Sequence, residues 1–298
     1  MKNNIRRASL ATAALCALLA GCAVGPRYAP PEVPAITLAS GEKGQFSDAA
    51  PVPAPWWSFL DDAALAEAIE RALAHNHDIR QAQANLRVSR ALFDEQQLER
   101  TPAVTAQGGY QRGSEQRAGG GGAPQRSLSA SWRAGFDVEW EIDLFGRLGH
   151  LAQSAQARAD AAQADLALVR LTVAADVARH YYQGQGLQRR LALAQGQAES
   201  WRATLALLQS RLAAGNGALD AVESARAELA RSEAALAPLA TARDQAQFRL
   251  DVLTGQRPGH SPFAAQTLAP APLARQLPLG DVNRLIRQRP DVVRAERL

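Results

Sequence analysis

Residues 128–144 read LSASWRAGFDVEWEIDL, and along this stretch every even-numbered residue is apolar while every odd-numbered residue is polar or glycine. Successive side chains of a β-strand point to opposite faces, so the alternation predicts one strand over 128–144 with an apolar and a charged face. Strands of about 9–11 residues cross an outer membrane, with apolar side chains toward lipid and polar ones toward a wet lumen. We therefore expect lipid to meet Trp132, Phe136, Val138, Trp140 and Ile142, and the lumen to meet Asp137, Glu139, Glu141 and Asp143. The alternative is a long soluble hairpin strand that packs on helices.

A weaker strand is predicted before this stretch, from Ala103 to about Gln111, and the polar loop 112–127 with its glycines joins the two. Two strands cannot close a barrel, so a membrane interpretation requires other chains to supply the remaining strands. In that interpretation the four acidic side chains keep the lumen wet and favour cations.

The rest of the body is predicted to be helical. Asp61 or Asp62 can cap a first helix, and apolar residues then recur at three- and four-residue steps until Pro102. From Leu148 to about Ala214 the same spacing continues without proline, which predicts one helix of roughly 65 residues, or about 100 Å.

A second long helix is predicted after the break at 215–217. Asp220 is expected to cap it, and it runs from Ala221 to about Leu253, so that the two helices form an antiparallel hairpin. Residues 281–298 then repeat the character of the first helices, since 285–291 align with 72–78. The chain ends early in this second copy without a stop signal, so we expect a truncated sequence.

The N-terminus has the three parts of a secretory signal: Lys2 with Arg6 and Arg7, an apolar segment over 8–20, and a small-residue site before Cys22. The order Leu-Ala-Gly-Cys resembles a bacterial lipobox, in which the cysteine receives a lipid. The alternative is a secreted protein with a stray cysteine. The predicted organisation is a lipoprotein signal peptide (1–21), a lipidated proline-rich leader (22–60), a first repeat (61–255), a linker (256–280) and the start of a second repeat (281–298).

Composition excludes several other functions. Without Lys2, Arg6 and Arg7, the 33 basic residues become 30 against 29 acidic ones, so no nucleic-acid partner is expected. His75 and His77 would face different sides of a helix, so no metal site is expected. No catalytic grouping stands out, and the only attached group expected is a covalent lipid on Cys22.

Four stretches resemble the TolC-like outer membrane factors, in the lipoprotein branch of OprM and NodT type. They are residues 22–28 (CAVGPRY), 56–61 (WWSFLD), 140–147 (WEIDLFGR) and 289–292 (RPDV). The resemblance implies a mainly α fold with membrane β: long helical hairpins form an α-barrel part, and two strands per repeat contribute to a trimer-shared outer-membrane β-barrel.

The resemblance also implies a function. The expected role is a passive exit duct of a tripartite, RND-type efflux system, with a periplasmic adaptor and an inner-membrane efflux transporter as partners and a homotrimer as the assembly. The gate-forming hairpin would lie in the missing second repeat.

One further expectation follows from the same family. The helical tip resembles the adaptor-docking end of that family. The alternative is an ordinary helix turn, since any helical hairpin needs such residues. The tip residues are Arg211, Leu212, Gly215, Asn216, Gly217, Leu219 and Asp220. The alternatives to an exit duct are a periplasmic adaptor lipoprotein or a non-functional truncated reading frame.

Overall fold

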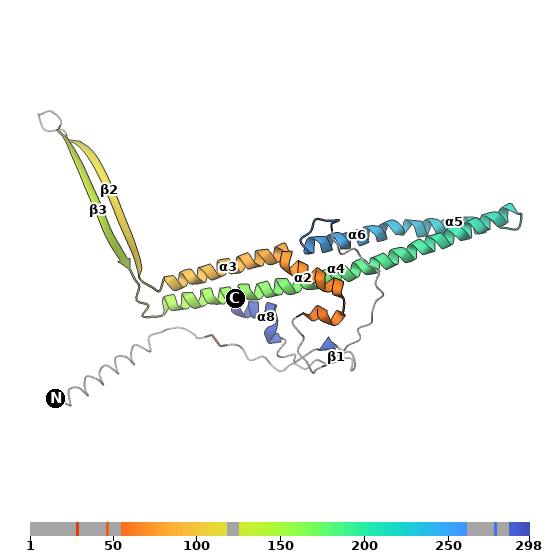
Figure 1. Cartoon of the computed structure of the whole chain (residues 1–298), viewed down its shortest axis with the longest axis horizontal. Helices are drawn as coiled ribbons and strands as arrows, with labels where there is room; N and C mark the ends of the chain where they lie inside the picture. The colour runs from red at the N-terminus through yellow and green to blue at the C-terminus, as the bar shows by residue number, and fades with distance from the viewer. Residues whose placement is uncertain (1–27, 30–45, 48–54, 118–124, 261–276, 279–285) are drawn as a thin grey trace. The chain divides into compact units, whose positions relative to one another are not determined.

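The computed structural model describes residues 28–29, 46–47, 55–117, 125–260, 277–278 and 286–298 (Figure 1). The predicted signal peptide, Cys22 and the glycines 119–122 lie outside these residues. The chain divides into two compact units. Within the described residues, unit 1 comprises 28–29, 87–117 and 125–160, and unit 2 comprises 46–47, 55–86, 161–260, 277–278 and 286–298.

Helices make up most of the described chain. They are the 3₁₀ helix η1 (Trp56–Leu60), α2 (Ala63–His75), α3 (His77–Leu98), α4 (Arg147–Ala213), α5 (Leu219–Ala234), α6 (Leu236–Leu253) and α8 (Pro290–Arg297). Two short strands, β1 (Phe46–Ser47) and β4 (Leu277–Pro278), pair in parallel. Strands β2 (Ala103–Arg117) and β3 (Gln125–Glu139) form an antiparallel hairpin.

The strand prediction is confirmed in kind and wrong in length. Strand β2 reaches Arg117 rather than Gln111, because every residue of its weak sequence has a register partner in β3. Strand β3 stops at Glu139 rather than Leu144, because Glu139 pairs with Ala103, the first residue of β2, and no partner residue remains beyond it. The alternation over 140–144 therefore does not mark strand.

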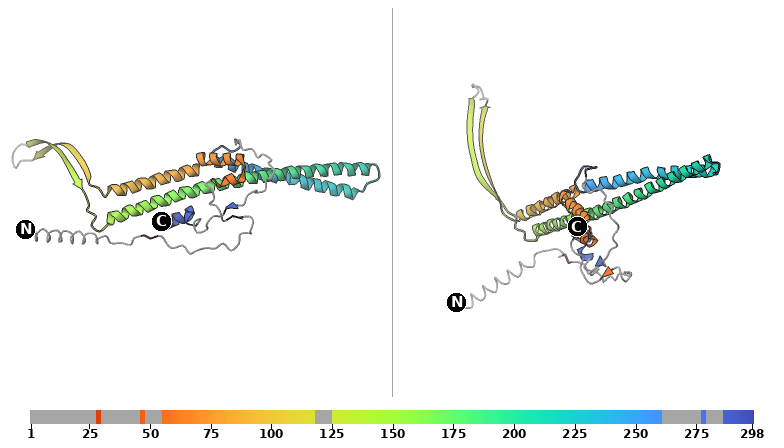
Figure 2. Two further views of the ribbon diagram at one scale, coloured as in Figure 1. Left: turned by 60° about the horizontal axis from the view of Figure 1, so that its bottom comes forward. Right: turned by 45° about the vertical axis from the view of Figure 1, so that its right-hand side comes forward.

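The long helix is confirmed, since α4 is one helix of 67 residues. Figure 2 shows that α5 and α6 run beside the part of α4 in unit 2, as a helical hairpin. The single second helix is wrong: it divides at Ala235, because Pro238 cannot donate to the carbonyl of Ala234. Asp220 does not cap α5 either. Residue Ala218 occupies the cap, and the Asp220 carboxylate accepts instead from the N–H of Ala221.

The core of unit 2 joins α2, α3, α4 and α6. It is built from small and branched apolar side chains, and Leu65, Ile69 and Val177 are fully buried in it. Asp62 is the N-cap of α2, where its Oδ1 accepts from the N–H of Leu65 at 3.0 Å, as predicted. Tyr181 of α4 donates its hydroxyl to the same carboxylate oxygen at 3.2 Å, so one capping residue fixes α2 against α4.

Asn76 organises the junction between α2 and α3. Its Oδ1 accepts from the N–H of Asp78 at 2.8 Å and of Ile79 at 3.2 Å, which caps the start of α3. Its Nδ2 donates to the carbonyl of Leu253 at 3.0 Å, the last residue of α6. Asn76 is 3% exposed, so these bonds are shielded from water.

The internal repeat has a structural counterpart. Helix α8 begins after Arg289, and α3 begins after Asn76, positions that the sequence alignment makes equivalent. In α8, the Arg294 side chain lies 3.1 Å from the Asp165 carboxylate of α4.

The described residues contain neither a membrane-spanning helix nor a metal-binding group of side chains. No helix there is both long enough and apolar enough to cross a membrane. In the same part of the chain, no three His, Cys, Asp or Glu side chains lie close enough together to hold a metal ion. His75 ends α2 and His77 begins α3.

Candidate functional site

The β2–β3 hairpin has two chemically distinct faces. Register pairs Val104 with Val138 and Ala106 with Phe136 on one face, and the aromatic rings of Tyr110 and Trp132 meet there at 4.4 Å between centroids. On the other face, Gln107 donates to the Asp137 carboxylate at 2.5 Å. The predicted separation of apolar from polar side chains thus holds over 104–110 of β2 and 132–138 of β3.

The apolar face has no cover within the described chain. Trp132 is 82% exposed and Phe136 is 78% exposed. The side chains of Val138, Leu128 and Val104 are each about two thirds exposed. Water-exposed aromatic and branched residues on one continuous face indicate contact with a membrane or a partner.

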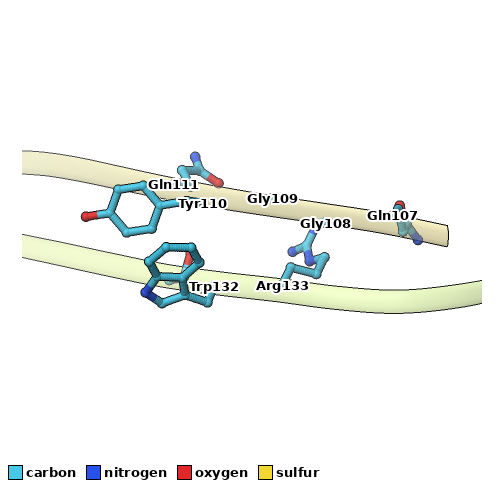
Figure 3. A pocket seen from close by; sticks show the side chains of 8 residues that line it. Gln107, Gly108, Gly109, Tyr110, Gln111, Trp132 and Arg133 are labelled. Atoms are coloured by element: carbon cyan, nitrogen blue, oxygen red, sulfur yellow. The ribbon is translucent and has the colours of Figure 1, made fainter.

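A shallow hollow of about 360 Å³ lies at the middle of the hairpin (Figure 3). It is lined by 107–111 of β2 and 131–133 of β3. A Cβ at Gly108 or Gly109 would meet no atom within 4 Å, so both positions face open space. Tyr110 and Trp132 lie together at one end of it in Figure 3.

Four of the predicted strand residues lie beyond β3, so the structure does not place them on either face of that strand. These are Trp140, Glu141, Ile142 and Asp143. The Trp140 ring N–H donates to the carbonyl of Arg100 at 3.4 Å, and Ile142 is exposed. The two acids instead build the connection from β3 into α4.

Glu141 and Asp143 both bind the start of α4. The Glu141 carboxylate accepts from Arg147 through both oxygens, from Nε at 3.1 Å and from an Nη at 2.5 Å. The Asp143 carboxylate accepts from the backbone N–H of Gly149 at 2.7 Å. Gly146 directly precedes α4 and has φ +82°, a conformation that favours glycine.

The electrostatics of this connection follow from those bonds. Partial desolvation raises the pKa of Asp143, but the backbone N–H groups of Gly149, Leu148 and Arg147 outweigh it and hold that pKa below its ordinary value. The hydrogen bond that Arg147 donates to the Glu141 carboxylate raises the pKa of Arg147. Both acids therefore bind the start of α4, where their negative charge also interacts favourably with the positive end of the helix dipole.

The polar face accordingly differs from the predicted row of four acids. Asp137 and Glu139 remain on it, close to the first residues of β2. Arg133 is a cation on the same face that the acid-based prediction missed, and it pairs with Gly109. The sequence could have assigned Arg133 to the polar face, because Arg133 and Asp137 are both odd-numbered positions of the alternation.

The helical tip brings its predicted residues together. Helix α4 ends in a paired hydrogen-bond motif: Asn216 donates to the carbonyl of Arg211, and Gly215, at φ +77°, donates to that of Leu212. Gly217 lies so close to this turn that a Cβ would be 2.6 Å from the N of Leu212. Arg211, Leu219 and Asp220 are exposed there.

Comparisons with known proteins agree with this geometry. Residues 68–256 match the family model described as outer membrane efflux protein. Outer membrane protein OprJ of Pseudomonas aeruginosa is 31% identical, over 96% of this chain and 60% of OprJ. Nodulation protein T of Rhizobium leguminosarum bv. trifolii is 30% identical, over 94% of this chain and 59% of that protein.

A solved structure, that of the outer-membrane channel OprN, superimposes with a TM-score of 0.82 and 32% identity, over 93% of this chain and 61% of OprN. The chain thus spans about three fifths of the length of the relatives it matches. The resemblance noted from the four sequence motifs is confirmed, because the family model covers well over half of the chain, and the protein belongs to the outer membrane efflux protein family.

Proposed function

We propose that this chain is a subunit of the outer-membrane exit duct of a tripartite efflux system. The observation that carries the proposal is the hairpin, which presents an exposed apolar face opposite a face with Arg133, Asp137 and Gln107. Lipid on one side and water on the other satisfy both faces at once. The hairpin would lie in the outer membrane and the helices in the periplasm, and no catalytic step is involved.

The assembly would be a homotrimer. Strands β2 and β3 pair only with each other among the described residues, so each has an edge with unpaired N–H and C=O groups. Such groups are too costly to leave unpaired in hydrocarbon, and only a closed barrel pairs all of them. Further strands must therefore come from outside the described hairpin, and copies of the same chain are the simplest source.

The helical tip would dock a periplasmic adaptor, which in turn contacts an inner-membrane efflux transporter. Exposed Leu219 supplies an apolar contact, and Arg211 and Asp220 supply charges of both signs. We expect a cysteine at Leu219 to cross-link to the adaptor in cells. A cysteine at Leu193, an exposed position within α4 away from the tip turn, is the matched control.

Cys22 would carry the lipid anchor. We expect the chain from cells fed labelled palmitate to carry the label, and Cys22→Ser to lose it. The control Cys16→Ser leaves the label unchanged, because Cys16 lies in the apolar segment of the predicted signal peptide. Equal labelling in both variants would contradict the anchor.

Conductance tests the duct itself. The purified protein, reconstituted in a planar bilayer, should produce stable conductance steps. Protein that is recovered from washed outer membranes and does not conduct would contradict the duct. Recovery in the soluble periplasmic fraction would favour an adaptor lipoprotein instead.

A further inference from the structure

Arginine side chains conflict with the apolar face of the hairpin. Arg112 of β2 lies between Tyr110 and Ser114 on that face, and its register partner is Ala130. The contacts of two neighbours fix this placement, since the Tyr110 ring packs against Trp132 and Ser114 accepts from Arg126 at 2.8 Å. The Arg112 side chain has no hydrogen bond or ion pair with any residue that the structure describes.

The depth of Arg112 follows from the strand geometry. From Leu128 to Val138 the apolar residues of β3 extend about 33 Å along the strand. A tilt of about 40° reduces this to about 25 Å, the height of the apolar band of a membrane barrel. Arg112 lies level with Ala130, which places it about 5 Å inside the loop end of that band.

A guanidinium at this depth requires an anion. It is always charged, it cannot pair with Ala130, and its stem is long enough to reach the boundary of the band. The loop end of the hairpin is opposite the end that enters α3 and α4, so it faces the outer leaflet when the helices lie in the periplasm. The lipid of that leaflet is lipid A, whose headgroup carries phosphates, and guanidinium binds phosphate with two parallel hydrogen bonds.

We propose that Arg112 binds a phosphate of lipid A, with the Tyr110–Trp132 pair packed against the adjoining acyl chains. The inference rests on the proposed membrane placement of the hairpin. Aromatic rings at this level suit the boundary between headgroup and hydrocarbon. Arg126, two positions beyond Leu128 on the same face, already donates to Ser114, so Arg112 is the cation left for the lipid.

Binding can be measured by native mass spectrometry of the full-length protein in detergent, titrated with bisphosphorylated lipid A and with dephosphorylated lipid A. We expect Arg112→Gln to weaken binding of the phosphorylated lipid about tenfold or more, the loss typical of one charge-assisted hydrogen bond. Arg112→Lys should restore part of it. The matched control is Arg133→Gln, which removes the same charge from the opposite face and should bind as the wild type does.

Three results would overturn the site: equal binding by Arg112→Gln and wild type, equal loss in Arg133→Gln, or equal binding of the dephosphorylated lipid. The conductance assay separates this site from the duct. A protein that conducts without Arg112-dependent binding retains the duct and loses the site. A protein that binds lipid A through Arg112 and never conducts retains the site and loses the duct.

Discussion

Asn76 is a buried polar side chain that joins three helices at one junction. Replacing it with alanine removes the cap of α3, which costs about 0.5–2 kcal/mol. It also leaves the buried carbonyl of Leu253 without the donor that Asn76 supplies, at a cost of about 1–3 kcal/mol. We therefore expect Asn76→Ala to lower the free energy of unfolding by about 1.5–5 kcal/mol.

A second variant separates the two contributions. Serine caps helices about as well as asparagine but has no amide to reach Leu253, so Asn76→Ser should lose only the carbonyl contribution, about 1–3 kcal/mol. Gln81→Ala is the matched control, because Gln81 is an exposed residue of α3. We expect that control to change the free energy by no more than about 0.5 kcal/mol.

Guanidinium unfolding of the detergent-solubilised protein, followed by helical circular dichroism, measures these differences. The reasoning fails if Asn76→Ala unfolds at the same denaturant concentration as Gln81→Ala. If Asn76→Ser is as unstable as Asn76→Ala, the capping bonds contribute nothing and only the bond to Leu253 matters. If Asn76→Ser matches the wild type, the bond to Leu253 contributes nothing.

Three further predictions concern the core, the tip and the hairpin. Burial and then the charge of the nearby Asp62 raise the pKa of Tyr181 from 10.0 to about 12, so the unfolded chain releases the phenolic proton at a lower pH than the folded chain does. The free energy of unfolding should therefore fall between pH 10 and about 12, and Tyr181→Phe should flatten that fall in the same unfolding assay. Gly217→Ala should reduce adaptor cross-linking at Leu219 several-fold because its Cβ would clash with the tip backbone, whereas Gly196→Ala, whose Cβ would meet no atom within 4 Å, should leave cross-linking unchanged. Phe136→Arg should cost about 2–4 kcal/mol in the membrane and deplete the folded oligomer in washed outer membranes, and normal levels there would contradict lipid contact by that face.

Local periodicity explains how much of the fold was predictable. Alternation with period two predicted the two faces of β3, and the proline-free apolar spacing predicted a helix that the structure shows as Arg147–Ala213. Both patterns are properties of a single segment, because side-chain direction repeats within a strand or helix whatever lies beside it. The same reasoning placed the tip break at 215–217 and limited the cap to Asp61 or Asp62, of which the structure uses Asp62.

Pairing explains what the periodicity could not predict. Residues 140–144 continue the alternation without fault, yet β3 ends at Glu139 because its partner strand begins at Ala103. Glu141 and Asp143 then bind the start of α4, where local sequence alone had assigned them to a lumen. Asn76 gave no sequence signal for its bond to Leu253, since the two residues are far apart along the chain.

The sequence by itself determined which residues share a face, which segments are helical and to which family the chain is similar, because these depend on composition and spacing within short segments. Only the tertiary structure decided where each strand stops, which acids bind a helix start and which buried carbonyl Asn76 satisfies. Those outcomes depend on hydrogen bonds between segments that are distant in sequence, and such bonds form only where packing brings a donor and an acceptor within about 3 Å.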